Sequence, residues 1–244
     1  MTCSFDSVQT LDEWADQLLA PLNGSRYPLS GSIDLTERCN LGCVHCYINQ
    51  PAGDSAVRAG ELTTDQWKQV LDQLAEAGCL FLLISGGEPL LRPDFSELFI
   101  YARKKGMLVT LFTNGTLLTP EIADVLADWG LHAMEITLYG ATPQTYEAVT
   151  GQPGSFERCI RGIDLALARG IKLSLKTVLL TLNRHELEEM KAITNRYGLK
   201  FRYDNTLWPR LNGDHRNQVY EISQEEILAF DLADEERNDS WQET

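Results

Sequence analysis

Strand-like and helix-like hydrophobic patterns alternate along this sequence with few exceptions. The strand-like runs are residues 32–35, 80–85, 108–113, 132–138, 172–179 and 200–205. The segments with helical spacing are residues 62–77, 93–105, 120–129, 156–169 and 184–197. Alternation at this spacing predicts an α/β fold in which parallel strands are joined by right-handed crossovers. The sheet is then either open and doubly wound, or a closed or partly closed barrel.

Polar and glycine-containing motifs follow the expected strands at their carboxyl ends. They are residues 36–46 after the first strand, Gly86-Gly87-Glu88-Pro89 after the second, Thr113-Asn114-Gly115 after the third and Tyr139-Gly140 after the fourth. The carboxyl ends of parallel strands meet at one edge of a sheet or one mouth of a barrel. The sequence therefore predicts one shared site at that end.

The length and composition indicate a single main domain. The chain has 244 residues, of which 43% are hydrophobic, and this supports one sizeable core. The expected parts are an N-terminal extension over residues 1–27 with a short helix at 8–19, the main domain over 28–206, and a loop, a helix at 223–231 and a charged tail over 207–244.

The net charge restricts the partners that we expect. The formal charge is −14 at pH 7. Phosphate backbones are bound through clustered Lys and Arg, so we expect neither nucleic acid nor an anionic membrane as a partner. The first thirty residues contain no basic region followed by an apolar run, and no stretch approaches the roughly 20 apolar residues of a membrane span. The sequence therefore predicts a soluble, cytoplasmic protein.

Three of the six cysteines crowd into eight positions, as Cys39-x-x-x-Cys43-x-x-Cys46. Thiolates are soft ligands that favour zinc or iron–sulfur clusters. A structural zinc site closes with four ligands, and His45, the obvious fourth, is adjacent to Cys46 and badly placed to join the same tetrahedron. A cubane cluster held by three cysteines leaves one iron open to the amino and carboxylate groups of a small molecule. The spacing favours the cluster and leaves zinc as the alternative.

Other cysteines and two tryptophans have structural interpretations. Cys79 begins an apolar strand and Cys159 lies within a helix, so both are predicted to be small core residues. Cys3 lies in a loose terminus. Trp67 and Trp129 lie on apolar helix faces, and both are expected in the core.

The remaining candidates are polar residues at strand ends. Gly86 and Gly87 let the backbone approach a ligand closely, and Glu88 can pair with an ammonium group. An ordinary turn before Pro89 is an equally good interpretation of these residues. The other candidates, which can bind a ribose hydroxyl or a carboxylate or serve as structural turn residues, are Thr113, Asn114, Thr137 and Lys176.

The segment Cys39-Asn40-Leu41-Gly42-Cys43-Val44-His45-Cys46-Tyr47 resembles the signature of the radical S-adenosylmethionine superfamily, with Tyr47 matching the aromatic after the third cysteine. The resemblance implies a 4Fe-4S cluster on the three cysteines. Its open iron binds S-adenosylmethionine, whose reductive cleavage gives a 5'-deoxyadenosyl radical. Residues 86–89 resemble the GGEP motif of that family, which orients the methionine amino group. The implied fold is a (β/α)6 partial TIM barrel, open on one side. The resemblance assigns no catalytic acid or base.

Further segments resemble the branch of the family that modifies peptides and proteins. They are Pro28-Leu29, residues 151–156 and Leu211-Asn212-Gly213. This resemblance implies hydrogen abstraction from a peptide or protein substrate, with a reductant such as flavodoxin or ferredoxin. That branch usually carries a C-terminal SPASM domain with auxiliary clusters. No cysteine follows Cys159, so this sequence either is a fragment of a longer protein or works with one cluster.

Two alternative functions remain. One is a radical S-adenosylmethionine enzyme of haem or other small-molecule cofactor biosynthesis, since such members share the Cys-Asn-Leu-x-Cys-x-His-Cys-Tyr pattern. The other is a truncated homologue that binds a metal without turnover.

Overall fold

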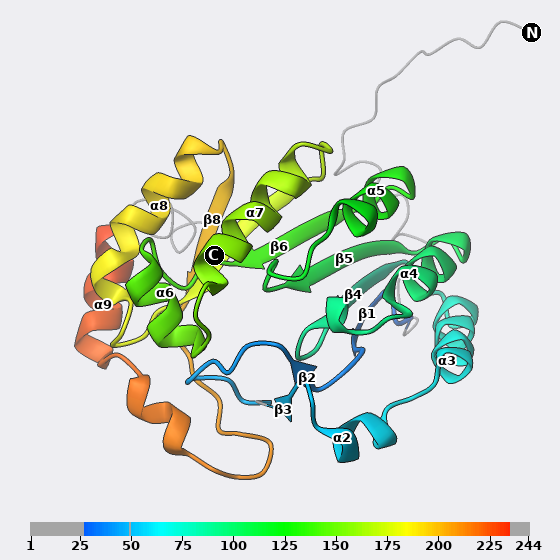
Figure 1. Cartoon of the computed structure of the whole chain (residues 1–244), viewed down its shortest axis with the longest axis horizontal. Coiled ribbons are helices and arrows are strands. Elements are labelled where there is room, and N and C mark those ends of the chain that lie inside the picture. Colours follow the sequence, from blue (N-terminus) through cyan, green and yellow to red (C-terminus); the bar gives the residue numbers. More distant parts are fainter. Residues whose placement is uncertain (1–26, 49, 235–244) are drawn as a thin grey trace, which may run out of the picture.

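The computed structural model describes residues 27–48 and 50–234, and its centre is a six-stranded parallel sheet. The strands are β1 (Ser30–Asp34), β4 (Phe81–Ser85), β5 (Leu108–Thr113), β6 (Ala133–Thr137), β7 (Leu173–Val178) and β8 (Lys200–Asp204), paired in that order (Figure 1). A doubly wound sheet reverses its strand order at a switch point, and this sheet does not. The two edge strands, β1 and β8, do not pair with each other in the described chain. The fold is therefore a partial barrel, as the family resemblance implies.

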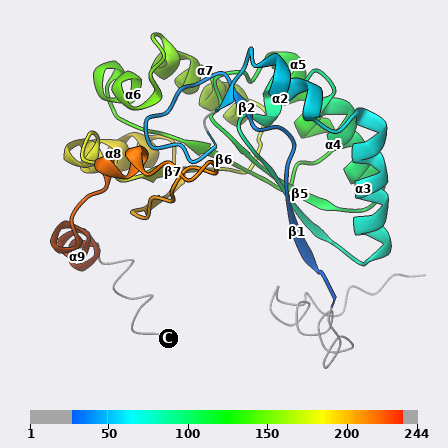
Figure 2. The same ribbon diagram turned by 90° about the horizontal axis from the view of Figure 1, so that it is seen from below.

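Five helices cover one face of the sheet (Figures 1 and 2). They are α3 (Thr64–Glu76), α4 (Phe95–Lys104), α5 (Pro120–Asp128), α7 (Ser155–Leu167) and α8 (Leu187–Arg196). Local sequence sets where they begin: Thr63 forms a capping box with Gln66, and Thr119 caps the helix that Pro120 starts. The strands and helices expected from the alternation are all present, with ends within three residues of the predicted ones.

Several short elements were not predicted. Helix α6 (Pro143–Thr150) lies between β6 and α7, and α2 (Ser55–Gly60) follows the paired dipeptides β2 (Arg38–Cys39) and β3 (Gln50–Pro51). The described residues also contain three 3-10 turns: η2 (Pro89–Leu91), η3 (Arg184–Glu186) and η4 (Arg216–Tyr220). Helix α6 did have sequence signals, because Thr142 caps it, Pro143 occupies its first turn and Gly151 ends it at φ +65°. At eight residues, it is too short for hydrophobic periodicity to reveal.

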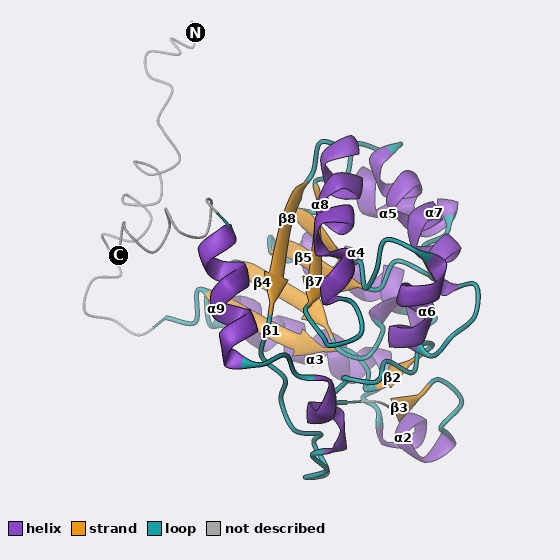
Figure 3. Ribbon diagram, turned by 90° about the vertical axis from the view of Figure 1, so that its left-hand side faces the viewer, coloured by secondary structure: helices purple, strands orange, loops and turns teal. Residues whose placement is uncertain are grey.

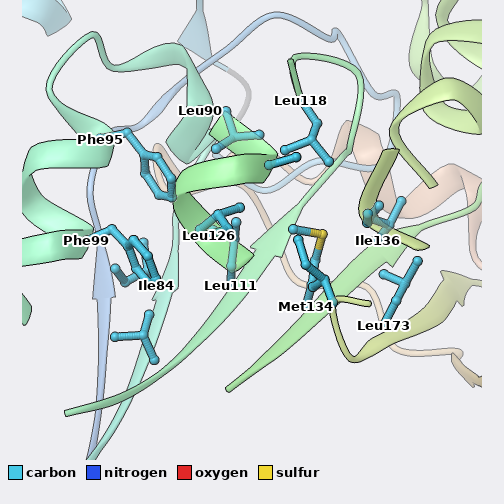
Figure 4. Close-up of a cluster of buried hydrophobic side chains, with 14 of the residues drawn as sticks. Ile84, Leu90, Phe95, Phe99, Leu111, Leu118, Leu126, Met134, Ile136 and Leu173 are labelled. Atoms are coloured by element: carbon cyan, nitrogen blue, oxygen red, sulfur yellow. The ribbon is translucent and has the colours of Figure 1, made fainter. Parts of the chain in front are cut away.

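The core lies between the sheet and its helices. Alternate residues of each strand, such as Ile84, Leu111 and Met134, point toward the helices and meet Phe95 and Phe99 of α4 or their neighbours (Figure 4). All five are at most 2% exposed. Full burial of such a side chain stabilises the fold by about 1.5–3 kcal/mol. The residues between them face the inner side of the sheet, so the same alternation that builds the core also supplies polar side chains to the barrel interior.

The structure confirms three of the four predictions about core residues and corrects one. Trp67, Cys79 and Cys159 are buried as expected. Trp129 is 38% exposed, so its placement in the core was wrong. Helix α5 ends at Asp128, which makes Trp129 the C-cap residue, and its ring meets the Lys104 ammonium 5.4 Å away instead of the core. Cys3 and the helix expected at residues 8–19 lie outside the described residues.

A C-terminal helix, α9 (Gln224–Ala233), completes the described chain. Ser223 and Glu226 form its capping box, which confirms the helix expected at residues 223–231. The helix lies apart from α5 and α7 (Figures 2 and 3), and Phe230 accepts a hydrogen bond at its backbone oxygen from Tyr203 Oη of β8 (3.2 Å). Among the described residues, no helix is long and apolar enough to cross a membrane.

Candidate active site

A cavity of about 550 Å³ opens at the carboxyl ends of the strands. Ten of the twelve residues singled out from the sequence line it: Cys39, Cys43, Cys46, Tyr47, Gly86, Gly87, Thr113, Asn114, Thr137 and Lys176. The other two, Glu88 and Pro89, are buried behind its wall. Segments 39–48 and 204–208 complete the wall. Residues spread over about 140 positions of sequence are thus brought to one mouth, because every strand runs toward it.

Backbone hydrogen bonds fix the cysteine loop, residues 39–47. Helix α6 ends beside it, so that Gly42 N donates to Thr150 O (2.8 Å) and Val44 N donates to Val149 O (3.0 Å). Within the loop, Cys46 N donates to Cys43 O (3.1 Å), which turns the chain between the second and third cysteines. The loop is therefore held by an element that the hydrophobic pattern did not reveal.

Burial makes Cys39 and Cys43 poor thiolates without a cationic partner. It raises the pKa of Cys39 to about 12 and that of Cys43 well above its ordinary value, and repulsion from the neighbouring cysteines adds to both shifts. Hydrogen bonds from Leu41 and Asn114 oppose the shift of the Cys39 pKa. Three soft donors on one wall of a cavity fit an iron–sulfur cluster, whose positive irons supply the missing compensation. In the described part of the chain, no three His, Cys, Asp or Glu side chains gather around a point that suits one ion.

Gly86 and Gly87 let the turn after β4 lie directly against the strand end that carries Cys39. A Cβ atom at Gly86, where φ is +131°, would overlap the backbone oxygen of Thr36. A Cβ atom at Gly87 would overlap the backbone oxygen of Arg38. Gly87 N donates to Thr36 O (2.7 Å) across the same contact. Both glycines are therefore required for packing, in addition to facing the cavity.

Glu88 joins two of the site's loops from inside the protein. Its carboxylate is fully buried and accepts hydrogen bonds from Thr113 Oγ1 (2.7 Å), Asn114 N (2.8 Å) and Leu90 N (3.0 Å). Burial raises its pKa to about 7, against the lowering effect of these three donors. The carboxylate that the sequence suggested for an ammonium group thus already accepts three hydrogen bonds from within the chain. Its contact with a cofactor stays a prediction.

Thr137 and Lys176 line the cavity from β6 and β7, and the charged side chains of Glu135 and Arg202 lie beside Lys176. Thr137, Lys176 and Arg202 are register partners across β6, β7 and β8. Lys176 Nζ lies 3.4 Å from Glu135 Oε2, while Arg202 Nη2 lies closer to the same oxygen (2.7 Å). Burial lowers the pKa of Lys176 to about 8. Lys176 therefore lines the cavity as a cation, and its ion pair with Glu135 is longer than that of Arg202.

His45 lies between the second and third cysteines and lines the cavity beside Tyr139. The two ring centroids are 5.0 Å apart. Burial lowers the pKa of His45 to about 4, so the imidazole is neutral at physiological pH. It packs as an aromatic ring rather than acting as a cation.

Glu61 anchors the segment that leads to Cys39, and sequence analysis missed it. Its carboxylate accepts from Arg38 Nε (2.8 Å) and Nη2 (3.1 Å), from Arg92 Nη1 (3.4 Å) and from Thr36 Oγ1. Arg38 comes directly before the first cysteine, and Arg92 comes just after residues 86–89. Glu61 precedes α3 and gave no signal except its charge, because its partners are brought to it only by the fold.

Asn217 anchors the cysteine loop from the C-terminal side and was also missed. It is fully buried, and its Nδ2 donates to His45 O (3.0 Å), 172 positions away, and to Trp208 O (2.7 Å). Leu211 N donates to Tyr47 O (3.0 Å) in the same region. Segment 205–220 has no hydrophobic period, so nothing in the sequence linked it to the cysteines.

Comparison with protein families gives one match over most of the chain. The model of the Radical SAM superfamily matches residues 33–193. The AdoMet-dependent heme synthase of Methanosarcina barkeri is 37% identical over 195 residues, which cover 80% of this chain and 55% of that protein. The mycofactocin maturase MftC of Mycobacterium tuberculosis is 36% identical over 176 residues, which cover 72% of this chain and 44% of that protein. The chain thus spans about half the length of these relatives.

Solved structures share the fold at low sequence identity. Streptococcus suis SuiB superimposes with a TM-score of 0.66 at 18% identity, covering 86% of this chain and 49% of SuiB. The structure of anSMEcpe with bound AdoMet and the Cp18Cys peptide gives a TM-score of 0.64 at 19% identity, covering 80% of this chain and 55% of that one. These likenesses agree with the partial barrel described above.

Proposed function

Because the chain belongs to the radical S-adenosylmethionine superfamily, whose members use a 4Fe-4S cluster and S-adenosylmethionine, we propose that it holds the cluster on Cys39, Cys43 and Cys46 and acts on a peptide or protein. When both cofactors are bound, the chemistry supplied at the site is one-electron cleavage of the sulfonium, which yields a 5'-deoxyadenosyl radical for hydrogen abstraction. The observation that carries the proposal is that all three cysteines line the same cavity as Gly86 and Gly87.

The protein's own groups then bind and orient the cofactor. The backbone of Gly86 and Gly87 faces the cavity next to the cysteines and offers polar groups to the amino end of the cofactor. Across the cavity, the Thr137 hydroxyl can bind a ribose hydroxyl, and the Lys176 ammonium can pair with a carboxylate. A flavodoxin or ferredoxin is the reductant that we propose.

A peptide substrate is supported by the named activities of relatives. Besides the mycofactocin maturase, the PqqA peptide cyclase of Ruegeria pomeroyi is 36% identical over 164 residues. SuiB has been solved with its precursor peptide SuiA. These peptides belong to those proteins, and we extend only the substrate class to this chain.

A second candidate is a reaction on a tetrapyrrole. The AdoMet-dependent heme synthase is 37% identical, and the Fe-coproporphyrin III synthase of Methanosarcina barkeri is 39% identical over 160 residues. Both identities are as high as those of the peptide-modifying relatives. The proposal therefore needs a test that separates the two substrate classes.

The first test is formation of 5'-deoxyadenosine. The protein is reconstituted anaerobically with iron and sulfide, reduced with dithionite in the presence of S-adenosylmethionine, and assayed by chromatography. We expect product from the wild type and from Cys79→Ala, whose cysteine is buried away from the cavity, and none from Cys43→Ala. Product from Cys43→Ala would remove that cysteine from the site. Bound zinc in place of iron and sulfide would instead support the metal-binding homologue without turnover.

The second test compares substrate classes with defined probes. The reconstituted protein is incubated with synthetic SuiA and PqqA peptides and, separately, with Fe-coproporphyrin III. A mass change in a peptide, with faster 5'-deoxyadenosine formation, supports the peptide proposal. A mass change in the tetrapyrrole alone would replace it with the second candidate.

A further inference from the structure

Asn114 is a cavity residue whose side chain reaches the first of the three cysteines, Cys39. It follows β5, is 9% exposed, and places Nδ2 3.7 Å from Cys39 Sγ, within hydrogen-bond range for sulfur. Its backbone is fixed independently, because Asn114 N donates to the buried Glu88 carboxylate (2.8 Å). From the sequence, this residue was a candidate for contact with a ribose or a carboxylate, with a structural turn role as the alternative. The structure gives it a partner of a different kind.

The orientation of the Asn114 amide follows from its other contacts. Thr116 N lies 2.9 Å from Asn114 Oδ1, and a backbone N–H can only donate, so the oxygen must face Thr116. The nitrogen must then face Cys39 and Asn40. The Asn114 amide therefore presents an N–H group to the Cys39 sulfur.

A closed ring of three hydrogen bonds locks this orientation. Thr116 Oγ1 donates to Asn114 Oδ1 (2.6 Å), Asn114 Nδ2 donates to Asn40 Oδ1 (2.9 Å), and Asn40 Nδ2 donates to Thr116 Oγ1 (2.8 Å). Each group donates to the next, so the bonds polarise one another in one direction. Asn114 uses one amide hydrogen within the ring, which leaves the second for the sulfur of Cys39.

Cluster ligation strengthens this contact. A protonated Cys39 Sγ can donate to Asn40 Oδ1, 3.9 Å away, but a ligating thiolate has no hydrogen and can only accept. Leu41 N, 3.4 Å from the same sulfur, is a second donor. Hydrogen bonds to cluster sulfurs are one of the means by which a protein sets the reduction potential. They favour the reduced form because its sulfurs carry more negative charge.

We infer that Asn114 is a positioning residue that donates a hydrogen bond to the Cys39 thiolate, held in place by Asn40 and Thr116, and thereby raises the reduction potential of the cluster. The inference rests on the proposed ligation by Cys39. It extends that proposal, because a cluster that is reduced more readily accepts its electron from a weaker donor.

The test is an anaerobic potentiometric titration of the reconstituted protein, followed by electron paramagnetic resonance and carried out without S-adenosylmethionine. Leaving out the cofactor separates an effect on the cluster from any contact between Asn114 and that cofactor. In Asn114→Ala we expect the ratio of reduced to oxidised cluster at a fixed potential to fall about tenfold. For a one-electron couple, that ratio corresponds to a potential lower by about 59 mV.

Two further variants should shift the reduction potential by different amounts. Asn114→Asp keeps the acceptor for Thr116 but replaces the donor with a negative charge, so its potential should lie below that of Asn114→Ala. Thr116→Val removes the hydroxyl but keeps Thr116 N as a donor to Asn114, so its potential should lie between those of wild type and Asn114→Ala. If Asn114→Ala takes up no iron, the shift in Thr116→Val decides the question.

The outcomes separate this inference from the proposed function. Iron and sulfide analysis comes first, and a wild-type protein without about four irons would overturn both. If the wild type carries the cluster and the variants titrate at its potential with the same iron content, only the role of Asn114 is refuted.

Discussion

Removal of the Glu61 carboxylate should be the most damaging single change outside the hydrophobic core. Glu61 is the shared acceptor of Arg38 and Arg92, whose side chains are only 8% and 7% exposed. Its shortest contact with either arginine, to Arg38 Nε, is 2.8 Å long. Arg92 keeps Asp94 as a partner at 2.7 Å, whereas Arg38 forms an ion pair with no carboxylate other than Glu61 among the described residues.

The magnitude follows from leaving a buried guanidinium without its anion. Breaking one partner out of a buried ion pair costs about 3–5 kcal/mol. We therefore expect Glu61→Ala to lower the free energy of unfolding of the cluster-free protein by about that amount. The matched control is Glu97→Ala, which breaks the Lys68–Glu97 pair at the surface, where Glu97 is 57% exposed and a pair contributes about 0–1 kcal/mol.

The assay is urea denaturation monitored by circular dichroism. The two variants are compared on the condition that the slope of the unfolding free energy against urea concentration is the same for both. Loss of stability in Glu61→Ala should also reduce cluster uptake, because Glu61 holds the segment that carries Cys39. The result that would refute this reasoning is a difference of less than about 1 kcal/mol between the unfolding free energies of Glu61→Ala and Glu97→Ala. It would mean that the unpaired arginine costs no more than a broken surface ion pair.

Two other changes test the turn after β4. Gly87→Ala should displace the strand end at Arg38, lower the free energy of unfolding by about 1–3 kcal/mol and impair iron incorporation, as measured by denaturation and iron analysis. Unchanged iron content would show that the turn tolerates a Cβ atom. Burial raises the pKa of Glu88 to about 7 in the folded protein, so its stabilising contribution to the cluster-free fold is fully present below the unfolded pKa of about 4.5 and is lost as pH rises through 7. Glu88→Gln should therefore flatten the pH dependence of the unfolding free energy between pH 4.5 and 7, and an unaltered profile would contradict the raised pKa.

The C-terminal segment also contributes directly to the site. Asn217 and Leu211 hydrogen-bond to the backbone of the cysteine loop, and Leu207 and Trp208 line the cavity. Trp208 is 68% exposed despite that position. The barrel and the segment after β8 therefore form the wall of the same cavity around the cysteines, although their sequences differ in character.

The sequence alone determined the elements and gathered the three candidate cysteines into one short loop. Hydrophobic periods of two and 3.6 residues are local properties, so they predicted the six strands and five helices within a few residues. The spacing of Cys39, Cys43 and Cys46 is also local, and it was enough to indicate an iron–sulfur cluster. Trp129 was wrongly expected in the core because hydrophobic periodicity does not show where a helix ends.

Only the tertiary structure decided which partner each strand-end residue contacts. Glu88, assigned to a ligand by its motif, is enclosed by Thr113 and Asn114, because the turn after β4 packs against the end of β5. Asn114 faces a cysteine 75 positions away, and Asn217 holds the cysteine loop from 172 positions away. Contacts of this kind depend on strand register and loop packing over long separations, and a local pattern in the sequence carries no information about which distant groups the fold will place together.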